Sequence, residues 1–191
     1  MRKKALIFDC FGVLYPQASK NFFTRYQHLF KNGYEIFDKL NFQIDLGKIT
    51  RKEFFTGVEK EIGMPADKIQ NEIDRELIFD RELVEFIKKQ KNSYKIGLLS
   101  NAGQDEISII YDDKIDSIFD TKVVSYEVGI VKPNPELYLL CAKRLGVLPE
   151  ECIFIDDSPS CISGAESVGI SSILFKDTKQ LKVELLKYGI N

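Results

Sequence analysis

The sequence has no long hydrophobic run, no cluster of metal-binding cysteines and almost no excess of charge of either sign. No stretch of about 18 apolar residues occurs, so a membrane-spanning helix is not predicted. The apolar run from Ala5 to Phe8, near the start of the chain, is too short for the core of a signal peptide. These absences predict a cytoplasmic protein that does not interact with membranes.

Cysteine and histidine are few. Cys10, Cys141, Cys152 and Cys161 do not have the spacing of zinc ligands, and we interpret them as reduced thiols within apolar patterns. The net charge is −2, so a basic surface for nucleic acid is not predicted. An anionic substrate would therefore need a local positive site.

Hydrophobic residues make up 44% of the chain and charged residues 29%, as in globular proteins that bury a core. Five short apolar runs have the composition of strands that are buried on both faces of a parallel sheet, at 5–8, 95–99, 122–125, 152–155 and 171–175. Helix signals separate the later runs. Asp80 and Asn134 are candidate N-caps, and a further helix is predicted from Pro159 to Val168. Strands that alternate with helices predict an α/β fold with a doubly wound, Rossmann-like parallel sheet.

The stretch from 15 to 79 shows helix signals and no convincing buried strand. One of these signals is a capping box, in which Thr50 precedes Glu53 by three positions. We therefore predict an α/β core domain made of residues 1–14 and 80–191, with residues 15–79 inserted after the first strand as a helical cap domain.

Polar residues follow four of the predicted strands. They are Asp9 after the first, Ser100 and Asn101 after the second, Lys132 in the loop after the third, and Asp156 and Asp157 at the end of the fourth. Side chains at the carboxyl ends of parallel strands converge on one crevice of the sheet. These six residues are therefore expected to form one site.

The residue types at this edge suit one chemistry. Crowded carboxylates repel each other, and a hard divalent cation such as Mg²⁺ relieves the repulsion. Ser100, Asn101 and Lys132 supply donors for a phosphoryl group, whose transfer depends on positioning and charge neutralisation. One of the carboxylates could attack phosphorus and form an aspartyl-phosphate.

Four segments resemble the four signature motifs of the haloacid dehalogenase-like (HAD) hydrolases, in the order of that family. They are Ile7–Leu14, Leu98–Ala102, Val131–Tyr138 and Phe154–Ser158. The resemblance covers about 4–9 and 80–186, whereas the insertion resembles the helical cap of the family only in position and class.

The resemblance implies a role for each residue. Asp9 would be the nucleophile, and Ser100 and Lys132 would bind phosphate. Mg²⁺ would be the cofactor, bound by Asp9, the backbone carbonyl of Phe11 and Asp157, with Asp156 as a further or outer ligand. The substrate would be a small-molecule phosphate ester, and the protein would act as a monomer or homodimer.

Phe11 departs from the family pattern. Phosphatases of the family usually carry a second aspartate two residues after the nucleophile, which protonates the leaving group and then activates water. Phe11 can do neither, although its backbone carbonyl can still contact a metal. Loss of a general acid typically slows catalysis by about 10²–10⁴-fold.

Three interpretations remain open. The first is a phosphatase that obtains its proton from a cap residue or from water; His28 is one candidate donor, although a lone histidine is more often a surface or packing residue. The second is a phosphate- and Mg²⁺-binding module with little turnover. The third is a metal-independent 2-haloacid dehalogenase, which the paired acids Asp156 and Asp157 disfavour and for which neither Arg25 nor Arg51 is a confident match to the substrate-binding arginine.

Overall fold

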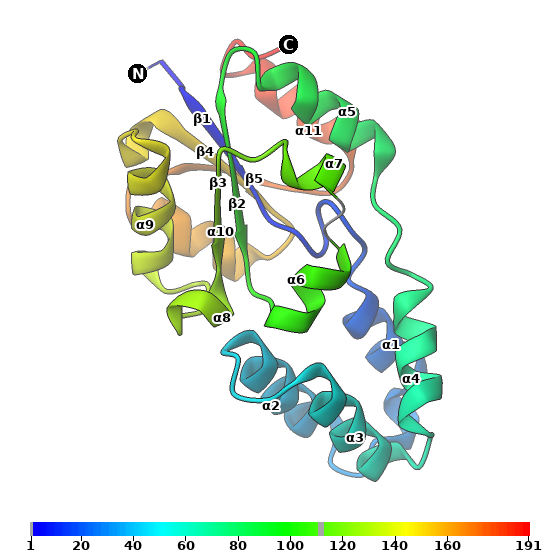
Figure 1. Cartoon of the computed structure of the whole chain (residues 1–191). Coiled ribbons are helices and arrows are strands. Elements are labelled where there is room, and N and C mark those ends of the chain that lie inside the picture. The colour runs from blue at the N-terminus through cyan, green and yellow to red at the C-terminus, as the bar shows by residue number, and fades with distance from the viewer. Residues whose placement is uncertain (1, 111–112) are drawn as a thin grey trace.

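The computed structural model describes residues 2–110 and 113–191, in which five parallel strands form one sheet (Figure 1). The strands are β1 (Ala5–Phe8), β2 (Lys95–Ser100), β3 (Thr121–Val124), β4 (Cys152–Asp156) and β5 (Ser171–Leu174). Their order is β3-β2-β1-β4-β5, which places β1 at the centre between β2 and β4. The predicted α/β fold class with a parallel sheet is confirmed.

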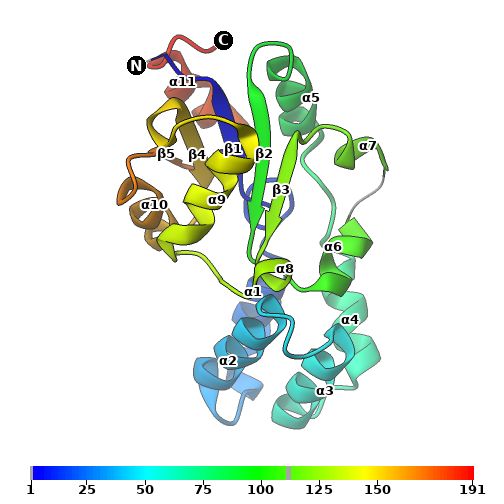
Figure 2. The same cartoon turned by 60° about the vertical axis from the view of Figure 1, so that its left-hand side comes forward.

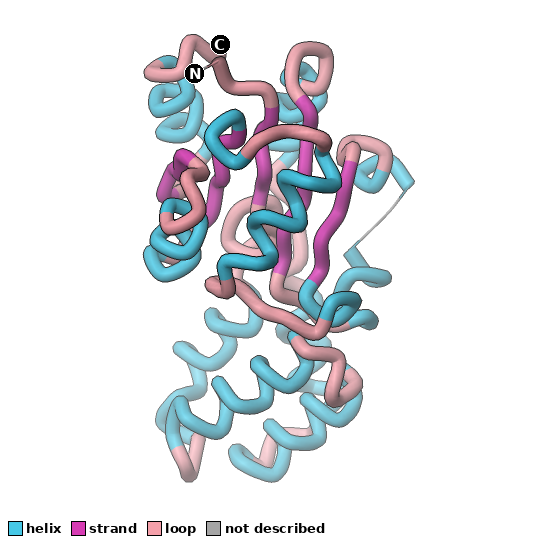
Figure 3. Tube along the Cα trace, turned by 90° about the vertical axis from the view of Figure 1, so that its left-hand side faces the viewer, coloured by secondary structure: helices cyan, strands magenta, loops and turns pink. Residues whose placement is uncertain are grey.

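Helices cover both faces of the sheet (Figures 1 and 3). The helices α5 (Arg81–Gln90) and α11 (Thr178–Leu186) pack on one face, and α9 (Pro135–Leu145) and α10 (Pro159–Glu166) pack on the other. In β1, Leu6 and Phe8 contact the first pair, and Ala5 and Ile7 face the second. All four residues of β1 are buried because helices cover both of its faces.

The predicted helix starts of the core are confirmed. The carboxylate of Asp80 accepts a hydrogen bond from the Leu83 amide at 3.0 Å, and the Asn134 side chain accepts one from the Glu136 amide at 3.0 Å. Several expected strand and helix boundaries are wrong by one or two residues. The helix from Pro159 ends at Glu166 rather than at Val168, and Ser125 begins the short helix α8 (Ser125–Val128) instead of ending β3.

Residues 15–79, called the cap segment below, contain helices and no strand of the sheet. The elements are α1 (Ala18–Tyr26), the 3₁₀ helix η1 (Gln27–Leu29), α2 (Gly33–Asp45), α3 (Arg51–Ile62) and α4 (Ala66–Asp74). The capping box of Thr50 and Glu53 is present at the start of α3, as predicted. The helices share an apolar cluster that includes Phe22, Phe37, Phe54, Val58 and Ile69. The division into two domains at 14/15 and 79/80 remains a prediction.

The cap segment lies beyond the carboxyl ends of the strands, at the end of the molecule opposite the two termini (Figures 1 and 2). Between the cap segment and the sheet lie α8 and the short helix α6 (Gln104–Ile110); α7 (Asp113–Asp116) follows α6 in the chain. The polar residues at the ends of the strands therefore lie at the edge of the sheet that is nearest the cap segment.

The other predictions of the sequence concern thiols and membranes. The four cysteines are buried and free, in agreement with reduced thiols. Within residues 2–110 and 113–191, no helix has both the length and the apolar character needed to span a bilayer. The cytoplasmic location remains a prediction.

Two glycines inside helices give a matched test of this packing. A Cβ at Gly164 in α10 would lie 2.7 Å from the backbone oxygen of Pro133, whereas one at Gly57 in α3 would meet only the flexible end of Leu40, at 2.9 Å. We expect Gly164→Ala to lower the free energy of unfolding by about 1–3 kcal/mol, because a backbone atom must move. Gly57→Ala should be neutral or gain up to about 1 kcal/mol, because alanine favours a helix. Urea denaturation of both variants measures the difference, and equal effects would contradict the close approach of α10 to the Pro133 loop.

Candidate active site

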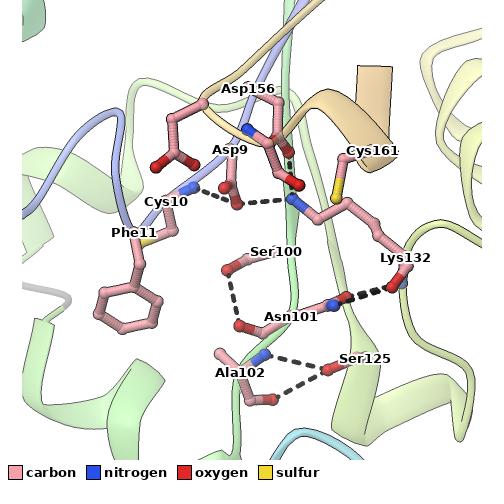
Figure 4. Close-up of polar contacts among 12 residues, drawn as sticks. Asp9, Cys10, Phe11, Ser100, Asn101, Ala102, Ser125, Lys132, Asp156 and Cys161 are labelled. Carbon is pink, nitrogen blue, oxygen red and sulfur yellow. Dashed lines mark hydrogen bonds and ion pairs between the residues drawn. The ribbon is translucent and has the colours of Figure 1, made fainter. Parts of the chain in front are cut away.

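Figure 4 shows five of the predicted polar residues close together at one edge of the sheet: Asp9, Ser100, Asn101, Lys132 and Asp156. Asp9 follows β1, Asp156 is the last residue of β4, and Asp157 comes directly after it. One oxygen of each of these three carboxylates lies within 4.8 Å of the others. The expectation that the strand ends converge is correct for these acids and for Lys132.

Lys132 joins two of the acids through its side chain. Its Nζ lies 2.7 Å from Oδ1 of Asp9 and 2.6 Å from Oδ2 of Asp156, and all three side chains are buried. Burial by itself would lower the pKa of Lys132, but Asp9 and Asp156 outweigh that effect and hold the pKa above its usual value. The ammonium group therefore stays charged, and it is the cation that these two buried carboxylates need.

Asn101 positions Lys132 through the backbone of that residue. Its Nδ2 donates to the Lys132 oxygen at 3.1 Å, and its Oδ1 accepts from the Lys132 amide at 2.8 Å (Figure 4). A side-chain amide that spans both backbone groups in this way fixes the loop after β3 against the end of β2. Asn101 also lines the cavity described below, and its role as a phosphate donor remains a proposal.

A donor group already lies between two of the predicted metal ligands. Gln17 Nε2 donates to the backbone oxygen of Phe11 at 2.9 Å and lies 3.3 Å from both carboxylate oxygens of Asp157. A Cβ at Gly12 would overlap the Asp157 carboxylate, so only glycine allows this approach. The oxygens of Phe11 and Asp157 thus surround the Gln17 amide group, whose hydrogens carry partial positive charge. Oxygen ligands arranged in this way also fit a hard cation.

The two neighbouring acids Asp156 and Asp157 differ in environment. Both oxygens of Asp156 are engaged, one with Lys132 and the other with the Ser158 amide at 2.8 Å. Asp157 is half-buried and faces Gln17; burial, followed by the negative charge of Asp156, raises its pKa. Of the two, Asp157 has the more open carboxylate for a metal, whereas Asp156 holds Lys132.

Burial also raises the pKa of Asp9, and Lys132 opposes that effect. The Cys10 amide donates to the same oxygen of Asp9, Oδ1, at 2.7 Å. The carboxylate is thereby oriented by one backbone donor and one ammonium group, while its other oxygen, Oδ2, belongs to neither of these contacts.

Neither Ser100 nor His28 lines the cavity that opens over the carboxylates. The Ser100 side chain is buried, contacts the Asn101 oxygen at 3.4 Å and is not among the residues that line the cavity. His28 is exposed on η1 and is likewise absent from the lining. The structure therefore does not bring His28 to the carboxylates, and phosphate binding by Ser100 remains a proposal.

A cavity of about 410 Å³ opens over the carboxylates, a size suited to a small-molecule site. Its floor includes Asp9, Lys132 and Asp157, and Phe11 forms part of its wall. The cap segment and α6 contribute charged and polar residues that were not predicted from the sequence: Gln17, Lys20, Asp38, Asp45, Arg51 and Glu106. Nothing in their local sequence marks these residues, because only the packing of the cap segment brings them to the site.

Comparison with known proteins identifies the family of proteins to which this site and fold belong. The profile of the family described as "haloacid dehalogenase-like hydrolase" matches residues 3–169, and the chain belongs to this family of hydrolases. The four motifs in the sequence and the five-stranded parallel sheet agree with that membership.

Three known proteins are similar to this chain in sequence or in fold. A phosphorylated carbohydrates phosphatase from Thermotoga maritima is 26% identical over 182 residues, which cover 89% of this chain and 83% of the relative. A HAD family enzyme from Bacteroides thetaiotaomicron, solved in complex with magnesium and inorganic phosphate, has a TM-score of 0.74 at 25% identity and covers 94% of this chain and 98% of its own. The L-2-haloacid dehalogenase from Xanthobacter autotrophicus shares the fold, with a TM-score of 0.65 at 19% identity over 99% of this chain and 84% of its own.

Removing the ammonium group tests its part in stability. We expect Lys132→Met to lower the free energy of unfolding at pH 7 by about 3–5 kcal/mol, because two buried carboxylates lose their cation. The difference in unfolding free energy between Lys132→Met and wild type should become smaller as the pH falls, because carboxylates without a cation can then take up protons. Urea unfolding at pH 7 and pH 5 measures both effects.

The matched control removes an exposed lysine. Lys182 Nζ lies 2.7 Å from Oε1 of Glu82 on the surface, and Lys182→Met should cost at most about 1 kcal/mol. A similar small loss for Lys132→Met would show that the buried ion pairs are not the main support of this edge of the sheet.

Proposed function

We propose that this hydrolase is a Mg²⁺-dependent phosphatase that acts on a small phosphorylated metabolite through an aspartyl-phosphate on Asp9. The observation that carries the proposal is the contact of Lys132 with Asp9, beside a set of acids whose oxygens lie within 4.8 Å of each other. A cation on each side of one nucleophilic carboxylate is what phosphoryl transfer requires, because the reaction depends on positioning and on neutralisation of charge.

The nucleophile is Asp9, and its two oxygens have different tasks. Oδ1 is held by Lys132 and by the Cys10 amide, so Oδ2 is the oxygen that attacks phosphorus. The bond from Oδ2 to phosphorus forms as the bond from phosphorus to the leaving oxygen breaks. Water then attacks the phosphorus of the aspartyl-phosphate, which releases inorganic phosphate and restores Asp9.

Lys132 and the residues around it hold the transferred group. The Lys132 ammonium is near enough to Asp9 to contact an oxygen of a phosphoryl group bound there, and Asn101 fixes the loop that carries it. Ser100 and the remaining amide hydrogen of Asn101 are the further donors that we assign to the phosphoryl group.

Mg²⁺ would be held by Asp9, the Phe11 carbonyl and Asp157, with Asp156 behind them. When bound, it neutralises the carboxylates and the phosphoryl oxygens, which would otherwise repel each other. Gln17 Nε2 occupies the position between Phe11 and Asp157, so this amide must turn away when the ion binds. The magnesium and phosphate bound to the Bacteroides thetaiotaomicron enzyme support this assignment.

The relatives and the cavity favour a small phosphorylated metabolite. The Thermotoga maritima relative is named for phosphorylated carbohydrates, and a cavity of about 410 Å³ accommodates a molecule of that size. Part of the cavity wall is polar and charged, with Asp38 and Asp45 from α2, Glu106 from α6, and the basic residues Lys20 and Arg51. Such a wall suits a leaving group that carries hydroxyl groups.

Asp9→Asn tests the nucleophile. We expect the variant to lose all Mg²⁺-dependent hydrolysis of 4-nitrophenyl phosphate, because an amide oxygen does not attack phosphorus, while circular dichroism and thermal unfolding remain close to wild type. Unchanged hydrolysis would overturn the proposal. Chloride release from a 2-haloacid without metal would instead identify a dehalogenase, and binding of phosphate without turnover by the wild type would identify a binding module.

Asp157→Asn tests the metal centre without reference to turnover. At a Mg²⁺ concentration of about 100 times the dissociation constant, wild type should gain about 2.7 kcal/mol of stability, because only the folded state has the site. Thermal unfolding with and without Mg²⁺ should show this shift in wild type and little of it in Asp157→Asn. The control is Glu166→Gln, which removes an exposed acid from the end of α10 and should keep the full shift. A full shift in Asp157→Asn would contradict the assignment.

A further inference from the structure

The proposed reaction needs a proton that Phe11 cannot supply. When the bond between phosphorus and the leaving oxygen breaks, an alkyl leaving group departs as an alkoxide unless an acid protonates it. The Phe11 ring lines the cavity at the position where the family usually has that acid. The donor must therefore be a different group that lines the same cavity.

Asp45 is the last residue of α2, and the structure fixes this end of the helix against the core. The Ser125 hydroxyl donates to the Asp45 backbone oxygen and accepts from the Ala102 amide, the latter at 3.0 Å (Figure 4). Gly103 lies so close to α2 that a Cβ there would be 2.9 Å from the Ile44 oxygen. The end of the helix is thus held beside the loop that follows β2, which also carries Asn101.

Asp45 lines the cavity with Asp9 and Lys132. Among residues 2–110 and 113–191, no hydrogen bond or ion pair to its side chain is found. A half-buried carboxyl group whose oxygens are unpaired is less stable as an anion than an exposed one. It is therefore a group that a ligand or a proton can stabilise.

The charges around Asp45 favour its protonated form. Burial raises its pKa well above the usual value, the negative charges of Glu106, Asp9 and Asp38 raise it further, and Lys132 opposes them. Its position at the C-terminal end of α2 acts in the same direction, because the helix dipole disfavours an anion there.

Glu106 is the competing acid, and its contacts favour the ionised form more. Its carboxylate accepts a hydrogen bond from the Gly103 amide at 2.9 Å, and the positive charge of Arg51 lowers its pKa, although burial raises it overall. Arg51 also forms an ion pair with Asp74. Asp45 has neither kind of stabilising contact, so it is the better donor of a proton.

We infer that Asp45 is the proton donor to the leaving group, in place of the acid that Phe11 replaces. This inference rests on the proposed phosphatase function. As Oδ2 of Asp9 bonds to phosphorus, the Asp45 carboxyl gives its proton to the leaving oxygen, and a neutral alcohol departs. Asp45, now a carboxylate, then accepts a proton from the water that attacks the aspartyl-phosphate, and both aspartates return to their starting states.

The test compares leaving groups. In Asp45→Asn, kcat for glycerol 2-phosphate should fall by about 10²-fold or more, because an alkoxide needs the proton. For 4-nitrophenyl phosphate the first step, measured as kcat/KM or as the burst of 4-nitrophenol, should change little, because its leaving group is stable without a proton. In wild type, kcat for glycerol 2-phosphate should decline as the pH rises through the raised pKa of Asp45, and Asp45→Asn should lack that decline.

Two further variants separate a proton donor from a structural residue. Glu35→Gln removes an exposed acid from the same helix and should behave as wild type. Phe11→Asp, combined with Asp45→Asn, should restore most of the lost rate for glycerol 2-phosphate, because it returns an acid to the usual position. The melting temperature of Asp45→Asn at pH 8 should equal or exceed that of wild type, since no buried anion remains.

Three outcomes would overturn the inference while leaving the phosphatase proposal intact. They are an unchanged dependence on the leaving group in Asp45→Asn, a rise in KM without a fall in kcat, and a leaving-group effect in Glu106→Gln instead of Asp45→Asn. No turnover of either ester by wild type with Mg²⁺ would overturn both.

Discussion

The ammonium group of Lys132 is the feature on which this edge of the sheet depends. It lies 2.7 Å from Asp9 and 2.6 Å from Asp156, which follow two neighbouring strands, and all three groups are buried. Buried charges of one sign destabilise a fold unless a partner is close, so the two acids and the lysine are stable only together. Much of the surrounding structure serves this contact. Asn101 holds the Lys132 backbone. The helix α10 lies so close to Pro133, the next residue in the chain, that its contact position is a glycine, Gly164.

The site is divided between the core and the cap segment. In the proposed mechanism the core supplies the groups that contact the phosphoryl group and the metal, which lie at or after the carboxyl ends of β1, β2, β3 and β4. The cap segment and α6 supply other parts of the cavity wall, which include the acids Asp38, Asp45 and Glu106. This division explains how the chain can keep a phosphoryl-transfer centre without an acid at position 11. The groups that meet the leaving group come from a different part of the fold and can change independently of the strand ends.

Much of the fold could be predicted because local patterns agreed with the tertiary structure. The run from Ala5 to Phe8 is uniformly apolar because helices cover both of its faces, and Asp80 and Asn134 cap helices with their own side chains. The errors occur where local signals are weak. Ser125 was assigned to a strand by composition, yet its hydroxyl bonds to Asp45 and Ala102, contacts that no local pattern encodes.

The sequence by itself determined the class of fold and the residues at the strand ends, because a buried strand and the polar residue after it are adjacent in the chain. It also showed that Phe11 cannot act as an acid. Only the tertiary structure decided how the acidic residues differ: Asp156 binds Lys132, Asp157 faces Gln17, and Asp45 lines the cavity with no side-chain partner among residues 2–110 and 113–191. Burial and the distances between charges control each of these properties, and both arise from segments that are far apart in the chain.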